Sequence, residues 1–104
     1  MHAIVRRYEG IDTKRTDELK QKIDDRLMPS LTKLPGFSGY FLIEAGDGVM
    51  SSVNFFDTSA QAEESSRVVA TWLREEKLET LVPNAPKITF GEVIAKKTNG
   101  AVRA

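Results

Sequence analysis

Four stretches of the chain mix apolar with polar positions and predict β-strands. They are rich in β-branched and aromatic residues and cover positions 2–9, 37–44, 49–56 and 87–95. The third stretch alternates most clearly, with Val49, Val53 and Phe55 opposite Met50, Ser52, Asn54 and Phe56. The Asp47-Gly48 turn before it tolerates the positive backbone angles of a tight hairpin, so the second and third strands are predicted to pair. In the second strand, Phe37, Phe41 and Ile43 are expected on one face.

The segment between the first two strands has the pattern of an amphipathic helix. Charged residues surround an apolar series with spacings of four and three, namely Leu19, Ile23, Leu27, Leu31 and Leu34. Asp12 or Thr13 offers the N-cap. Pro29 falls inside the series and removes one helical hydrogen bond, so a kink, or a break before a last short turn, is expected there.

A second amphipathic helix is predicted after the third strand, with Asp57, Thr58 or Ser59 as its N-cap. Its apolar stripe comprises Ala62, Val69, Trp72, Leu73 and Leu78. The complete order β-α-β-β-α-β is typical of the ferredoxin-like α+β fold, a four-stranded antiparallel sheet with two helices on one face. We expect this domain to span residues 1–97 and residues 98–104 to form a flexible tail.

The opposite face of such a sheet carries mixed residues that need a cover. A second copy of the chain is the commonest cover, so a homodimer is predicted. Composition adds exclusions: 15 basic and 15 acidic side chains balance, which gives no field that favours nucleic acid or an anionic membrane. Cysteine is absent, and no apolar stretch is long enough for a signal peptide or a membrane span, so a cytoplasmic protein without a metal centre is expected.

Five residues are candidates for a pocket: Arg7, Tyr40, Ser52, Asn54 and Trp72. Trp72 either lines a ligand cavity or belongs to the core. Arg6 and Arg7 point to opposite faces of a central strand, so one of them lies under cover. It holds a substrate anion or enolate, or it forms an ion pair with Glu44 or Glu92.

Ser52 and Asn54 share a face of the other central strand, near Tyr40 on its neighbour. They either position oxygen or a substrate carbonyl, or they bridge two subunits through hydrogen bonds. His2, the one histidine, is expected at the surface near a mobile terminus. RNA-recognition domains share this strand order but stack bases on aromatic residues of the first and third strands. In this chain the third strand has serine or methionine at those positions, and the first strand has no aromatic ring at the required place. RNA binding is therefore not expected.

Several short motifs together resemble the antibiotic biosynthesis monooxygenase-like domains of the dimeric α/β-barrel superfamily. They are Leu34-Pro35-Gly36-Phe37, Gly46-Asp47-Gly48, Phe55-Phe56-Asp57-Thr58 and Gly91-Glu92-Val93, and the resemblance extends over residues 3–96. It implies two back-to-back sheets in a dimeric barrel, with a cleft between sheet and helices in each subunit.

Some members of this family oxidise phenolic or polycyclic substrates with molecular oxygen and no cofactor, and others degrade haem. The haem degraders use an asparagine on the first strand, a tryptophan, and a histidine on the second helix. Trp72 is present, but the first strand carries arginines and no histidine occurs after position 2, so haem is not expected. Two hypotheses follow: a cofactor-independent oxygenase of a small aromatic or enolisable molecule, or a non-catalytic dimeric module that binds a small ligand or has a structural role.

Overall fold

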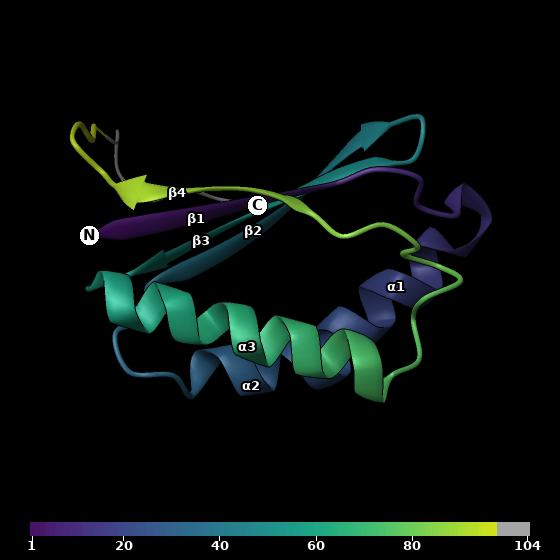
Figure 1. The fold of residues 1–104 in the computed structure, drawn as a ribbon, viewed down its shortest axis with the longest axis horizontal. Helices are drawn as coiled ribbons and strands as arrows, with labels where there is room; N and C mark the ends of the chain where they lie inside the picture. The colour runs from purple at the N-terminus through teal and green to yellow at the C-terminus, as the bar shows by residue number, and fades with distance from the viewer. Residues whose placement is uncertain (98–104) are drawn as a thin grey trace.

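The predicted order of strands and helices is confirmed in a computed structural model, which describes residues 1–97. Strands β1 (His2–Tyr8), β2 (Gly39–Gly46), β3 (Val49–Phe56) and β4 (Lys87–Glu92) form one antiparallel sheet in the order β2-β3-β1-β4. All helices cover the same face of this sheet (Figure 1). The fold is therefore ferredoxin-like, with the first and third strands at the centre. The expected tail, residues 98–104, lies outside the described residues.

The first helical segment begins with a 3-10 turn, η1 (Thr13–Arg15), which Asp12 caps by accepting a hydrogen bond from the Lys14 backbone N–H at 3.0 Å. It continues as α1 (Thr16–Lys22), a π-helical turn η2 (Ile23–Leu27) and α2 (Met28–Thr32). The interruption expected at Pro29 thus takes the form of a wide turn just before it, in which the Met28 N–H donates to the Ile23 carbonyl.

The wide turn has a second explanation in the apolar series. Leu19, Ile23, Leu27 and Leu31 are spaced by four residues throughout, whereas an α-helix has about 3.6 residues per turn. On a regular helix each step would drift by roughly 40° around the axis. The π turn winds more slowly and removes part of this drift, so all four side chains are buried.

Helix α3 (Ser59–Glu75) begins at Thr58, the middle one of the three predicted caps. The Thr58 hydroxyl accepts from the Gln61 backbone N–H at 3.3 Å, while the Gln61 side chain accepts from the Thr58 N–H at 3.1 Å. Ala62, Val69 and Trp72 are buried as predicted. Leu78 lies beyond the end of the helix, in the connection to β4, where it is buried with Leu81.

Two strand predictions need correction. The second strand begins at Gly39, so Phe37 does not share a face with Phe41 and Ile43. Gly36, with a φ of 76°, turns the chain and directs Phe37 against Phe56 in the core, with ring centroids 5.8 Å apart. The last strand ends at Glu92, three residues earlier than expected.

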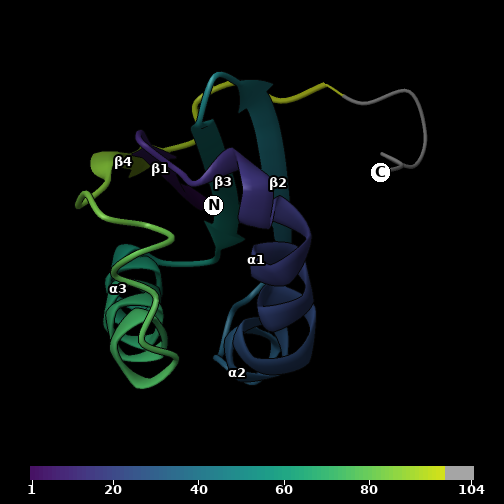
Figure 2. The same cartoon turned by 90° about the vertical axis from the view of Figure 1, so that its right-hand side faces the viewer.

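The sheet has one covered and one open face. Figure 2 shows α3 and the segment α1–α2 side by side beneath the sheet, and no helix of residues 1–97 lies on the opposite side. In β3 every second residue is buried, from Met50 to Phe56, which confirms the predicted alternation. None of the helices in residues 1–97 has both the length and the apolar composition that crossing a membrane requires.

Candidate functional site

A small cavity of about 30 Å³ lies between the covered face of the sheet and the helices. Most of its wall is aliphatic, contributed by α1, η2, β2 and α3. Four side chains with polar atoms interrupt this wall, namely Tyr8, Tyr40, Ser52 and Trp72. A cavity that accepts one benzene ring has a volume on the order of 150 Å³. The cavity therefore holds no more than a molecule the size of water.

Arg6 forms a buried polar cluster beside the cavity. One guanidinium nitrogen, Nη2, donates to the hydroxyls of Ser65 at 2.9 Å and Ser66 at 3.1 Å on α3. The other, Nη1, lies 3.4 Å from Oδ1 of Asn54 on β3. Arg6 is only 1% exposed, and Ser65 and Asn54 are fully buried. The cluster joins the two central strands to α3.

The cluster and the cavity influence each other electrostatically. Burial lowers the pKa of Arg6, and the nearby Tyr8 and Tyr40 oppose that shift. Burial also raises the pKa of both tyrosines above the usual range, despite the attraction of Arg6. Both phenols are consequently neutral near pH 7 and serve as hydrogen-bond donors or acceptors, not as bases.

Four of the five predicted pocket residues lie together. Tyr40, Ser52 and Trp72 line the cavity, and Asn54 is the cross-strand neighbour of Tyr40, as the hairpin register predicted. The Trp72 side chain serves as both a core residue and a cavity wall. The buried Nε1 of Trp72 and Nδ2 of Asn54 have no hydrogen-bond partner among the described residues.

Arg7 lies apart from this group. It points to the open face, its side chain is half exposed, and its Nε lies 3.5 Å from Oε1 of Glu9. Among residues 1–97, neither arginine of the pair contacts Glu44 or Glu92 through an ion pair, since Arg6 binds hydroxyl and amide oxygens instead.

Arg6 is the functional candidate that the sequence pattern did not single out. The alternation placed the two arginines on opposite faces but did not say which face is covered. A weak signal was available, because Ile4 and Tyr8 share the face of Arg6 and are bulkier than Ala3 and Val5. His2, expected at the surface, is partly buried and lies 6.0 Å from Phe90, measured between ring centroids.

An open groove of about 580 Å³ runs between α1 and β2 next to the cavity. Ile23, Tyr40, Leu42 and Met50 belong to the walls of both. Methionine is flexible, so rotation of Met50 with its neighbours would join the two spaces.

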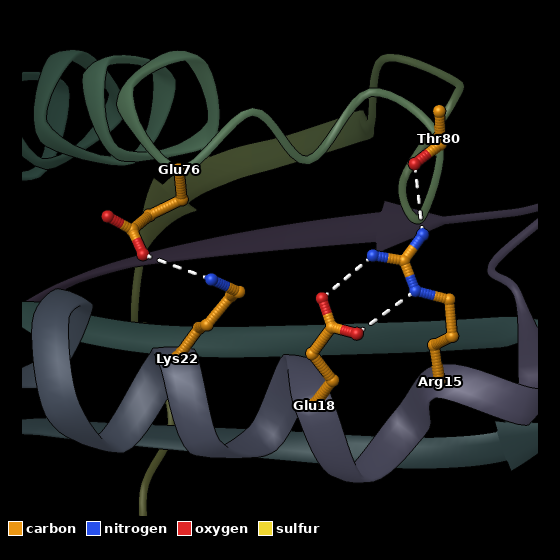
Figure 3. Close-up of polar contacts among 5 residues, drawn as sticks. All are labelled: Arg15, Glu18, Lys22, Glu76 and Thr80. Atoms are coloured by element: carbon orange, nitrogen blue, oxygen red, sulfur yellow. Dashed lines mark hydrogen bonds and ion pairs between the residues drawn. The ribbon is translucent and has the colours of Figure 1, made fainter.

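Polar contacts hold η1 and α1 to the connection after α3 (Figure 3). Arg15 pairs with Glu18 at 2.7 Å and donates to the Thr80 hydroxyl at 2.9 Å, while Lys22 Nζ lies 3.4 Å from Oε1 of Glu76. The connection also supplies Val82 to the cavity wall. Within residues 1–97, no three His, Asp or Glu side chains are arranged so that they could hold a metal ion.

Comparisons with known proteins agree on the fold. No protein-family model matches the chain, and no curated protein sequence matches it. A candidate antibiotic biosynthesis monooxygenase from Nitrosomonas europaea has a similar structure, with a TM-score of 0.72 and 11% identity over 91% of this chain and 100% of that chain. A monooxygenase from Streptomyces coelicolor, solved in complex with nanaomycin D, has a TM-score of 0.66 and 16% identity over 99% of this chain and 91% of that chain.

A dimeric ferredoxin-like protein from an uncultured marine organism is also similar, with a TM-score of 0.70 and 12% identity over 95% of this chain and 92% of that chain. At these identities the likeness shows the fold alone. The chain has the fold of the antibiotic biosynthesis monooxygenase-like domains, and the resemblance seen in its motifs is confirmed at that level.

Proposed function

We propose that this protein binds a small aromatic or enolisable molecule between its sheet and helices and oxidises it with molecular oxygen, without a bound cofactor. The observation that carries the proposal is a cavity with aliphatic walls and polar groups from Tyr8, Tyr40, Ser52 and Trp72. Such a site suits a planar apolar molecule whose oxygen atoms meet hydrogen-bond donors. The similar fold of the Streptomyces coelicolor monooxygenase, which binds nanaomycin D, supports the same class of ligand.

The proposed chemistry makes few demands on the side chains. No carboxylate or imidazole lines the cavity, so the substrate itself must ionise readily, as a phenol or an enol does. Donors near its oxygen atom stabilise the negative charge that results. In the oxidation of a phenol, a ring C–H becomes C=O with one atom of O₂, and the other oxygen atom leaves with the two displaced hydrogens as water. The product is a quinone.

The cavity must enlarge before such a substrate fits. Its volume of about 30 Å³ is well below the roughly 150 Å³ that a single ring requires. Tyr40, Leu42 and Met50 line both the cavity and the α1–β2 groove, so the proposed route opens when these side chains rotate toward the groove. Closure behind the substrate would exclude bulk water from the reaction.

Oxygen uptake with a panel of phenols and hydroquinones tests the proposal. We expect at least one compound to consume oxygen and form an equal amount of quinone, at a rate proportional to protein concentration. Trp72→Phe should slow this reaction by about tenfold or more, because it removes the indole donor from the cavity wall. Thr80→Val, outside the cavity, is the matched control. No uptake with any compound would contradict the proposal.

A non-catalytic ligand-binding or structural module is the second candidate, and the small size of the closed cavity favours it. The two candidates differ in turnover. A compound that binds, shifts the fluorescence of Trp72 and is recovered unchanged would favour the binding module. Trp72 is the only tryptophan of the chain, so this signal has a single source.

A second copy of the chain is the proposed partner, through the open face of the sheet. This face presents Phe41, Ile43, Val53 and Phe55 beside a groove of about 840 Å³, and Ile43 is 49% exposed. Apolar groups gathered on one face are typical of an interface. Native mass spectrometry should detect a dimer, and Ile43→Lys should yield a monomer because it places a charge in the interface. A wild-type monomer at micromolar concentration would contradict this proposal.

A further inference from the structure

Arg6 carries a positive charge in the interior with no acid to neutralise it. It is 1% exposed, and its contacts go to the neutral oxygens of Asn54, Ser65 and Ser66. No Asp or Glu among the described residues lies within ion-pair distance, and the nearby Tyr8 and Tyr40 are neutral phenols at physiological pH. Buried charges in proteins are normally paired, because an isolated charge loses its hydration without recovering that energy.

Two donors in the layer between the sheet and the helices have no acceptor among the described residues. The Asn54 carbonyl oxygen faces Arg6, and since a guanidinium only donates, this contact fixes the orientation of the amide. The amide nitrogen of Asn54 then points elsewhere and is unpartnered among the described residues, as is the indole N–H of Trp72. The interior of residues 1–97 therefore contains a cation bound only by neutral oxygens and two donors without an acceptor.

The cluster borders the cavity along several elements. Ser52, a cavity residue, is the direct cross-strand neighbour of Arg6, and Tyr40, another, is the neighbour of Asn54. On α3, Ser65 lies one turn before Val69, which also lines the cavity. A ligand that enlarges the cavity toward Ser52 and Val69 would meet Arg6 at that end.

We infer that Arg6 anchors a negatively charged group of the ligand, so that the substrate class is an aromatic or enolic carboxylic acid, with its carboxylate directed at β1. The inference deepens the proposed function, since it rests on the same cavity. The planar guanidinium can donate two parallel hydrogen bonds to one carboxylate, which an ammonium is less suited to do. The free N–H groups of Asn54 and Trp72 supply donors for the remaining oxygen atoms of such a ligand.

A pair of probes that differ only in charge tests the inference. Salicylate and salicylamide share the ring and the hydroxyl, but only salicylate is an anion at neutral pH. In calorimetric titrations of the wild-type protein, we expect salicylate to bind about tenfold to a hundredfold more tightly. Arg6→Gln should abolish this preference, whereas Arg67→Gln, on the exposed side of α3, should leave it unchanged.

Equal affinity of the two probes for the wild-type protein would overturn the inference, and so would binding of neither probe at millimolar concentration. A preference that survives in folded Arg6→Gln would overturn it as well. If this variant does not fold, the NMR resonance of the Arg6 Nε–H group in the wild-type protein tests the inference instead. It should shift with salicylate and not with salicylamide, and an unchanged resonance would refute the anchor.

The outcomes also separate this inference from the proposed oxygenase. Selective binding of salicylate in a protein that consumes no oxygen with any phenol would keep the anchor and remove the oxygenase. Oxygen uptake with neutral phenols, together with equal binding of the acid and the amide, would keep the oxygenase and remove the anchor.

Discussion

The two faces of the sheet differ in a way that reverses the usual pattern. Under the helices, the centre of the covered face carries Arg6, Ser52 and Asn54, all buried. The open face at the same level carries Val53 and Phe55, with Phe41 beside them on β2 and a ring-centroid separation of 6.3 Å between the two phenylalanines. An antiparallel sheet that faces water on one side normally places apolar residues inside and polar residues outside.

Each face of the sheet has groups without a matching neighbour among the described residues. Polar groups under the helices lack acceptors among the described residues, which is consistent with a ligand on the covered face. Apolar groups on the opposite face lack a cover, which is consistent with a second subunit. The end of the covered face at Phe56 behaves conventionally, because Phe56 packs with Ile4 and Ala62 in a small apolar cluster. Only the centre of the sheet departs from the expected pattern.

The largest expected difference between the faces concerns two adjacent phenylalanines. Phe56→Ala removes a fully buried ring and should lower the free energy of unfolding by about 3–5 kcal/mol. Phe55→Ala, on the open face, should have a smaller effect in dilute solution, and one that depends on protein concentration. Urea unfolding at two concentrations measures both. Equal losses at every concentration would contradict the distinction between the faces.

A second test removes the polar centre of the covered face. Arg6→Met combined with Asn54→Leu replaces the buried charge and its amide partner with apolar groups of similar size. We expect the free energy of unfolding to rise by about 1–4 kcal/mol while binding of acidic ligands is lost. Arg6→Met alone is the control, since it leaves Asn54 without its partner and should destabilise the protein. A strongly destabilised double variant would mean that the cluster is structural.

Alkaline pH should produce a smaller loss of stability through the two buried tyrosines of the covered face. Burial raises the pKa of Tyr8 and Tyr40, so the unfolded chain, with a tyrosine pKa of about 10, releases protons first. Stability is therefore retained below about pH 10 and lost as the pH rises above it, by up to about 1.4 kcal/mol per pH unit for each tyrosine. The chain has only 2 tyrosines, so tyrosinate absorbance should stay low until unfolding and then rise sharply. Gradual ionisation of folded protein near pH 10 would contradict their burial, and Tyr40→Phe should weaken the pH dependence.

The smallest effect is expected at the rim of the covered face. Lys22→Met breaks the partly exposed pair with Glu76 that joins α1 to the end of α3 (Figure 3). It should lower the free energy of unfolding by about 0.2–1 kcal/mol, and high salt should reduce the difference. A loss as large as that of Phe56→Ala would show that the rim, and not the packing beneath the sheet, stabilises the helical layer.

Most of the fold was predictable because its signals are local. The alternation of β3, the Asp47-Gly48 turn and the Thr58 cap each depend on residues a few positions apart. The end of β4 was not predictable, because an edge strand pairs only as far as its neighbour extends. β4 runs antiparallel to β1, so its last residue, Glu92, pairs with His2, the first residue of β1. The position of Phe37 was missed because the turn at Gly36 and the contact with Phe56 act together.

The candidate site was less predictable because it depends on pairings between distant strands. Ser52, Asn54 and Tyr40 belong to one hairpin, so their shared face followed from its register. The pairing of Arg6 with Ser52 joins residues 46 positions apart, and nothing in either strand specifies that alignment. The choice between Arg6 and Arg7 therefore required the packing of α3 against the sheet.

The π turn at Ile23–Leu27 separates two α-helical segments, α1 and α2, which otherwise follow one another without a gap. Before it, carbonyls bond amides four residues ahead, and within it the Ile23 carbonyl bonds the amide of Met28, five ahead. Pro29 has no amide hydrogen and cannot donate to the preceding turn. The α-helical hydrogen bonds that follow therefore form a separate short segment, α2, which ends at Thr32. In hydrogen–deuterium exchange, α1 and α2 should open as separate units, and α2, the shorter, should lose protection first. The helix would then loosen from its C-terminal end, at α2.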